Sequence, residues 1–284
     1  MAFLPSLHAP LPAAASRAPT DPAILELART GVLPDRDFVL RFFPVFDFQR
    51  GVVAALFCTP MYARAGAEAI YGHQALHGLA PGEGAAVDCA ILEHALTFAG
   101  RLRRHGVVAA VGASVSFATL CDPSGRVAYR EALRTAHARD ESYLVIKIEA
   151  IPETTGGQRI GEIVSCVRAL APRVFVHLPG SHVPLGGHEP LHAAGLVLSM
   201  PARLPQHGMQ TEARWLVRTA ALQSALACMD HIGSDGELEI TRAAGVRFVA
   251  GHALGRPALA AAAPLQDIRE QLYGAAEAPA RAFR

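Results

Sequence analysis

The most informative segment of this sequence lies near its carboxyl end and reads Ala243-Ala244-Gly245-Val246-Arg247-Phe248-Val249-Ala250-Gly251-His252-Ala253-Leu254-Gly255-Arg256-Pro257. A helix is expected to end at Gly245, because glycine takes the left-handed conformation after a helix without a Cβ clash. The apolar run from Val246 to Val249 follows at once and is typical of a strand buried on both faces. A loop containing Gly251 and Pro257 comes next. The segment therefore indicates the last αβ unit of a parallel α/β fold.

Strand and helix patterns alternate along the rest of the chain. Strands are expected at 38–48 and 52–57, joined as a hairpin, and then at 107–111, 143–149, 174–178, 195–200 and near Cys228. Helices are expected at 23–29, along an apolar stripe from Val87 to Leu102, at 126–137, 160–170 and 212–226, from a capping box at Ser234 to Gly245, and at 264–273. Such alternation predicts a parallel sheet, and the number of units favours a closed TIM-like (β/α)8 barrel with one antiparallel strand near the N-terminus.

Composition favours one large domain. The chain has 284 residues, of which 51% are hydrophobic and 18% charged, so much of the apolar content must be buried. We expect a single barrel at 21–274, with flexible tails at 1–20 and 275–284. The formal net charge is +1 with scattered basic residues, which argues against a nucleic-acid partner.

The cysteines and the apolar runs bear on localisation. The five cysteines form no C-x-x-C pair, so we interpret them as small buried hydrophobes in a reducing compartment rather than as disulfides or zinc ligands. The N-terminus lacks the basic region of a signal peptide. No uncharged apolar run reaches the roughly 18 residues that a membrane helix needs. A cytoplasmic protein without a membrane partner is expected.

The order and spacing of several segments resemble EAL domains, the bacterial phosphodiesterases that open cyclic-di-GMP. The closing segment is similar to their "G-x-x-x-x-Q-G-x-x-x-G-x-P", and Phe43-Pro44-Val45-Phe46-Asp47 to their opening "Q-P-I-x-D". Ala54-Ala55-Leu56 falls on the Glu-Ala-Leu signature, and Asp88–Ala95 resembles the helix motif "D-x-x-V-L-x-x-A". The resemblance covers roughly Phe38 to Pro257 and implies an EAL-type barrel.

The same resemblance implies a site that has lost its chemistry. EAL domains hold metal ions with carboxylates and an Asn at the carboxyl ends of the strands. At the matched positions this sequence has Ala54 for the signature Glu, Ser114 for the Asn and Lys147 for a strand Glu. His177-Leu178 replaces a pair of Asp residues, and Leu198-Ser199-Met200 replaces "K-I-D". The remaining replacements are Gly233 for a later Glu, and Phe43 and Ala250 for two Gln residues.

The residues alone lead to the same expectation. Active sites of such barrels lie at the carboxyl strand ends, where the plausible carboxylates are Glu149 and Asp230. Two carboxylates on separate strands give little support for a pair of divalent ions. We therefore expect no catalytic residue, no metal and no cofactor. The candidate degenerate pocket consists of Phe43, Ala54, Ser114, Lys147, Glu149, His177, Gly233 and Ala250.

Two features leave alternatives open. Lys147 and Glu149 alternate with apolar residues and share one strand face. In one interpretation, the Lys147 ammonium takes the space of a metal. In the other, the two residues form an internal ion pair in a pocket that has lost its function, or Lys147 sits at the strand end and reaches solvent. Histidines crowd a Gly/Pro-rich loop, which predicts either a transition-metal site or ordinary polar loop residues: His177, His182, His188 and His192. The resemblance implies that this loop region supports dimerisation.

The combined expectation is a catalytically inactive EAL-like domain in bacterial signalling. It would act as a regulatory protein-interaction module with an unidentified protein partner, or as a homodimer. The alternative is a non-hydrolysing cyclic-di-GMP receptor, which is weakened because Phe43, Ala54 and Ala250 replace polar positions. A further alternative is an enzyme with unrelated chemistry that uses Lys147, Glu149 and His177.

Overall fold

The computed structural model describes residues 26–27, 30–32, 38–62, 70–76, 79, 81–107, 109–138, 144–171, 173–181, 183, 185, 190–200 and 204–254. The expected helix at 264–273 and both expected tails lie outside these residues, as does most of the expected helix at 23–29.

The strands form one sheet in the order β1-β9-β8-β7-β6-β5-β4-β2-β3. Pairing of β1 with β2 closes eight of them into a barrel, and β3 pairs only with β2, outside the barrel. β1 runs antiparallel to β2 and to β9, whereas the other barrel neighbours are parallel. The expected barrel with one antiparallel strand is therefore confirmed. The strands are β1 (Phe38–Asp47), β2 (Val52–Tyr62), β3 (Ile70–Tyr71), β4 (Ala110–Ser116), β5 (Leu144–Glu149), β6 (Val174–Leu178), β7 (Gly195–Ser199), β8 (Leu226–Asp230) and β9 (Phe248–Ala250).

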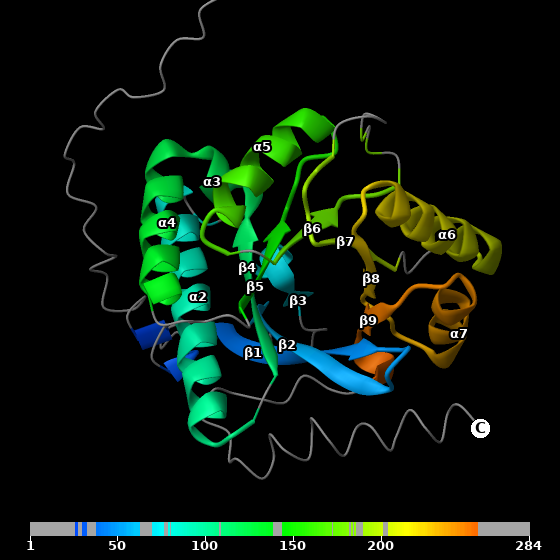
Figure 1. Ribbon diagram of the computed structural model, residues 1–284, viewed down its shortest axis with the longest axis horizontal. Helices are drawn as coiled ribbons and strands as arrows, with labels where there is room; N and C mark the ends of the chain where they lie inside the picture. Colours follow the sequence, from blue (N-terminus) through cyan, green and yellow to red (C-terminus); the bar gives the residue numbers. More distant parts are fainter. Residues whose placement is uncertain are drawn as a thin grey trace, which may run out of the picture.

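The helices surround the strands, with α2 and α4 on one side and α6 and α7 on the other (Figure 1). Among the described residues, no helix is both long and apolar enough to cross a membrane. The helical segments are η1 (Gly72–Leu76), α2 (Pro81–Arg104), α3 (Phe117–Cys121), α4 (Pro123–Ala138), α5 (Gly157–Arg168), α6 (Gln206–Leu222), α7 (Asp235–Ala243) and η2 (His252–Leu254).

The last αβ unit forms as the sequence predicts. The Ser234 hydroxyl accepts a hydrogen bond from the Glu237 N–H and caps α7. The Glu237 carboxylate reaches back to the Gly233 N–H at 2.7 Å, one residue earlier than in the usual capping box. Gly245 follows α7 with φ +85°, and Val249 in β9 is fully buried.

Several expected boundaries are wrong. The strands expected to end at 57 and 111 run on to Tyr62 and Ser116, and helix caps explain two other differences. The strand expected at 107–111 begins at Ala110, because the Val107 N–H bonds to the Leu102 carbonyl at 3.0 Å and closes the cap of α2. The helix expected at 212–226 spans Gln206–Leu222. It stops early because Ser224, at φ +53°, takes the left-handed position that glycine usually fills.

Packing divides into two clusters. The larger joins the outer faces of the strands to the helices, and the half-buried Trp215 packs against it. The smaller lies inside the barrel and includes Val45, Phe57, Val145 and Val197. All five cysteines are free; Cys58, Cys89 and Cys228 are buried as expected, whereas Cys121 and Cys166 are only half-buried.

Candidate functional site

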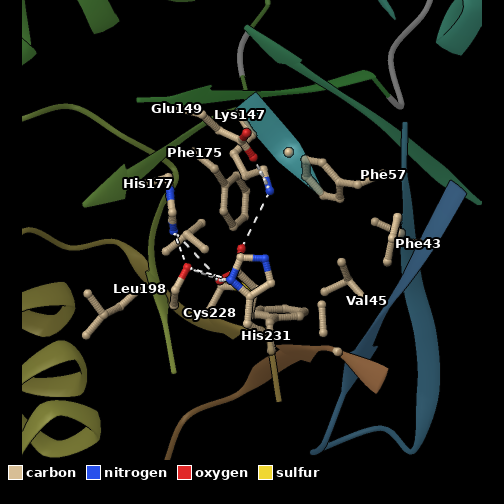
Figure 2. A pocket seen from close by; sticks show the side chains of 18 of the residues that line it. Phe43, Val45, Phe57, Lys147, Glu149, Phe175, His177, Leu198, Cys228 and His231 are labelled. Carbon is tan, nitrogen blue, oxygen red and sulfur yellow. Dashed lines mark hydrogen bonds and ion pairs between the residues drawn. The ribbon is translucent and has the colours of Figure 1, made fainter. Parts of the chain in front are cut away.

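A cavity of about 1060 Å³ opens at the carboxyl ends of the barrel strands. Figure 2 shows Lys147, His177 and His231 around it, with the aromatic rings of Phe57 and Phe175 alongside. Six of the eight sequence-predicted pocket residues line the cavity: Phe43, Ala54, Lys147, Glu149, His177 and Ala250. The expected place of Ala54 at a carboxyl strand end is wrong, because β2 continues to Tyr62 and Ala54 lies near its amino end.

The other two predicted residues, Ser114 and Gly233, are not among the cavity-lining residues. Ser114 lies on β4 beside Lys147 and is fully buried. Its hydroxyl makes no hydrogen bond within the described part of the chain. The Gly233 N–H is engaged by Glu237 at the start of α7. Ser114 is therefore part of the barrel wall, and Gly233 is part of the cap of α7.

The Lys147 ammonium lies between two carboxylates from different strands. It forms an ion pair with Glu149 on β5, and its Nζ lies 3.6 Å from Asp230 Oδ2 at the end of β8. The three side chains are only 12%, 7% and 13% exposed, respectively. Lys147 Nζ also lies 5.4 Å from the centre of the Phe57 ring, a cation–π contact.

The electrostatics of this group keep all three side chains charged. Burial acts to lower the pKa of Lys147, but the negative charges of Glu149 and Asp230 outweigh it and raise that pKa. Burial acts to raise the pKa of Glu149, yet Lys147 and His73 hold that pKa well below its usual value. The pKa of Asp230 is also well below normal, against its burial, because of His231, His177 and Lys147.

His73, which belongs to no motif in the sequence, bridges two buried carboxylates. Its Nδ1 lies 2.7 Å from Glu149 Oε2 and its Nε2 lies 2.8 Å from Asp88 Oδ1. Burial acts to lower the pKa of His73, but Asp88 and Glu149 raise it to about 10. His73 is therefore an imidazolium at neutral pH and acts as a fixed positive charge behind Glu149.

Asp88 anchors this chain of contacts to the helices. Its Oδ2 accepts hydrogen bonds from the Ser116 N–H at 3.0 Å and from the Thr119 hydroxyl at 2.6 Å. The sequence pattern marks Asp88 only as part of a helix motif. A continuous polar network thus runs from Lys147 through Glu149 and His73 to the end of β4 and the start of α3.

A second cluster centres on the hydroxyl of Ser199. Its Oγ lies 2.8 Å from Asp230 Oδ1, 2.8 Å from His177 Nε2 and 2.9 Å from His231 Nδ1. With its one proton donated to the carboxylate, the hydroxyl accepts from both imidazoles. His231 adopts φ +59°, an uncommon backbone conformation for a residue other than glycine.

The structure describes only two of the four histidines that the sequence places in this segment. His177 faces the cavity, whereas His182 and His188 lie outside the described residues. His192 is described and has φ +55°. The expectation of a metal site or a dimer contact at this loop stays a prediction.

The side chains at the strand ends do not fit a pair of divalent cations. Such ions need several free oxygen ligands, and here the oxygens of Glu149 and Asp230 are already paired with Lys147, His73 and Ser199. Among the residues that the structure describes, no group of three or more His, Cys, Asp or Glu side chains is arranged to hold a metal.

The closed barrel with its antiparallel first strand is an EAL-type TIM-like barrel. Solved EAL structures match it across most of its length, although no family model and no curated protein matches the sequence. The Xanthomonas citri FimX EAL domain in complex with c-diGMP is 18% identical, with a TM-score of 0.56 and coverage of 81% of this chain and 89% of that one. The PaMucR phosphodiesterase in its c-di-GMP complex is 13% identical, with a TM-score of 0.59 and coverage of 82% and 100%.

The EAL enzyme Bd1971 in its cAMP-bound form is also similar in structure. It is 10% identical, with a TM-score of 0.56. The match covers 78% of this chain but only 64% of Bd1971. At these identities the likeness shows the EAL fold.

Proposed function

We propose that this EAL-fold domain does not hydrolyse cyclic dinucleotides and acts as a regulatory protein-interaction module. The observation that carries the proposal is the position of the Lys147 ammonium between Glu149 and Asp230. Two-metal phosphodiester cleavage needs cations at the attacking and leaving oxygens. A covalently attached ammonium can neutralise the carboxylates, but it cannot activate a water molecule as a metal does.

A role through protein contacts is compatible with the outer surface. Leu222 at the end of α6 is 81% exposed. Large apolar side chains exposed in this way favour contact with another protein when they are contiguous. A homodimer is the simplest such contact. Sedimentation velocity should show a concentration-dependent dimer that Leu222→Lys abolishes, and a monomer at every concentration would contradict the homodimer.

The second candidate is a non-hydrolysing cyclic-di-GMP receptor. The cavity at the strand ends favours it, since FimX and PaMucR were solved with this ligand in the same fold. Charge argues against it. The lining side chains at this end include two cations, Lys147 and His73, against the carboxylates Glu149, Asp230 and Glu212. Both cations are already paired with Glu149. A dianionic ligand is bound best by unpaired Arg or Lys side chains.

Calorimetric titration with cyclic-di-GMP, with and without Mg²⁺, separates the candidates. The proposal predicts no saturable heat and no linear dinucleotide when the mixture is afterwards analysed by chromatography. Saturable heat that Lys147→Ala removes would establish the receptor instead. Formation of the linear product would overturn the proposal of an inactive domain. Arg168→Ala, an exposed change on α5 away from the cavity, is the matched control.

A further inference from the structure

The amino-terminal mouth of the barrel is the end at which the parallel strands begin, opposite the site described above. Strand register brings four segments together there. Asp47, the last residue of β1, lies beside both Val52, the first residue of β2, and Phe248, the first residue of β9. Leu226 begins β8, which pairs with β9. These strand ends therefore form one continuous arc of the barrel rim.

Apolar side chains on this arc are incompletely covered. Val52 is 41% exposed and Leu226 is 38% exposed, and Phe248 is half-buried. Phe248 packs on the cluster inside the barrel, whose members Val145 and Val197 are buried. The packed interior closes the mouth from below. The mouth is therefore a shallow basin with an apolar floor, open to solvent on its outer side.

Arginines stand on opposite sides of this basin. Arg50 lies in the turn between β1 and β2, whereas Arg173 directly precedes β6, on the far side of the barrel in the strand order. The Arg50 side chain is 74% exposed, and its Nε lies 3.9 Å from Asp47 Oδ2. Arg173 is exposed and forms no ion pair with any residue that the structure describes. Both guanidinium groups therefore present positive charge to solvent.

Negative charge is scarce at this end of the barrel. Asp47 is the carboxylate of the arc, but its side chain is only 3% exposed and Arg247 already binds it at 2.8 Å. Each helix of a (β/α) unit runs back to the start of the next strand, so α2, α5 and α7 end at this side. Their last turns contain basic residues and no acidic one: Arg101, Arg103, Arg104, Arg168 and Arg242.

The combination of charge and apolar surface favours a protein segment over other polyanions. Arg binds a carboxylate through two parallel N–H···O bonds, and an exposed apolar floor takes an apolar side chain of a partner. Nucleic acid binding depends instead on many phosphate contacts. The formal net charge of this chain is only +1, and apolar residues separate the two exposed arginines of the basin.

We propose that this basin docks an acidic segment of a partner protein. Carboxylates of the segment bind Arg50 and Arg173. An aromatic or aliphatic side chain between them packs on Val52, Leu226 and Phe248. The inference rests on the interaction role proposed above and adds its surface and the chemistry of its partner. The two can fail separately, because neither the cyclic-di-GMP titration nor the sedimentation experiment measures binding of an acidic segment.

The test is fluorescence anisotropy of a fluorescein-labelled glutamate–tyrosine copolymer, titrated with the whole chain at low ionic strength. Binding should be saturable, and polyglutamate of the same length should bind more weakly because it lacks the aromatic side chains. Arg173→Glu should weaken the copolymer about five- to tenfold, since repulsion replaces attraction at an exposed contact. Arg214→Glu makes the same charge change at an exposed position of α6 and should leave the affinity unchanged.

The apolar floor provides the second arm. Val52→Glu should weaken the copolymer, whereas Val127→Glu should not, because Val127 is 36% exposed on α4, away from the basin. Circular dichroism checks that these surface variants fold. Absence of saturable binding would overturn the proposal, as would polyglutamate as tight as the copolymer or an effect of Arg173→Glu or Val52→Glu no larger than that of its control.

Competition identifies the class of partner. Transfer RNA and phosphatidylserine vesicles should each displace the labelled copolymer less effectively than unlabelled copolymer does. If either competes better than the copolymer, the basin serves a nucleic acid or a membrane surface, and the proposal of an acidic protein segment is overturned.

Discussion

Arg247, just before the last strand of the barrel, holds Asp47 at the end of the first. Its Nη2 lies 2.8 Å from Asp47 Oδ2, and its Nε lies 3.2 Å from each carboxylate oxygen. The Asp47 side chain is only 3% exposed. The pair therefore ties β1 to β9 at the point where the barrel closes, 200 residues apart in the chain.

Arg247→Met should make the protein less stable at neutral pH and flatten its acid dependence. Burial acts to raise the pKa of Asp47, but Arg247 and the backbone donors lower it overall. A carboxyl with a lowered pKa stabilises the fold above its unfolded pKa of about 4, and this contribution is lost as the pH falls below that. Urea unfolding at pH 7, 5 and 3 measures the free energy of unfolding of both proteins. If that free energy depends on pH in the same way in the variant and the wild type, the role of Arg247 is refuted.

Lys147→Met should destabilise the fold by about 3–5 kcal/mol, since it leaves two buried carboxylates without their cation. Glu149→Gln should destabilise less, because Asp230 still faces the ammonium. The double variant Lys147→Met/Glu149→Gln removes one charge of each sign and should recover part of the loss. Denaturant unfolding of all three variants checks this, and strictly additive losses would show that the pair is not coupled.

His73 should make stability fall as the pH rises above neutrality. Its pKa rises from an unfolded value near 6.5 to about 10 in the folded protein. The imidazolium contribution is therefore complete below pH 6.5 and is lost progressively up to about pH 10. His73→Asn should be less stable at pH 6 and should lose this slope between pH 6.5 and 8.5. An unchanged slope in the variant would assign the pH dependence to other groups.

Gly245→Ala should cost about 1 kcal/mol through the backbone alone, because φ is +85° and no atom lies within 4 Å of the added methyl group. Gly236→Ala is the matched control, since it also has open space but an ordinary backbone within α7. Alanine is the better helix former there, so the control should be neutral or more stable. Equal effects of the two substitutions on the melting temperature would contradict the cap assignment.

The barrel could be predicted from the sequence because each of its strands and helices has a local sequence pattern. The strand at 174–178 has the bounds that its apolar run predicts, and the glycine after α7 takes the conformation that its position requires. Two of the boundary errors arose where Val107 and Ser224 take part in helix caps, because neither residue is of a type that usually marks a cap. Caps of this kind depend on backbone geometry rather than on side-chain type.

For the candidate site, the sequence predicts which residues share a face of one strand, but not the contacts between different strands. Alternation placed Lys147 and Glu149 on one face of β5, but the contact of Lys147 with Asp230 depends on barrel curvature, since β6 and β7 lie between their strands. His73 lies 76 residues from Glu149, in a short 3-10 helix without any periodic pattern. Contacts of that kind have no local signal in the sequence.

The most direct measurement of the central claim is titration of the wild-type protein with Mn²⁺, followed by electron paramagnetic resonance, with and without cyclic-di-GMP. If the Lys147 ammonium takes the place of a divalent ion, no saturable Mn²⁺ binding should arise at the strand ends. Glu149→Gln and Asp230→Asn should then leave the titration unchanged. Saturable Mn²⁺ binding that either substitution abolishes would contradict the account.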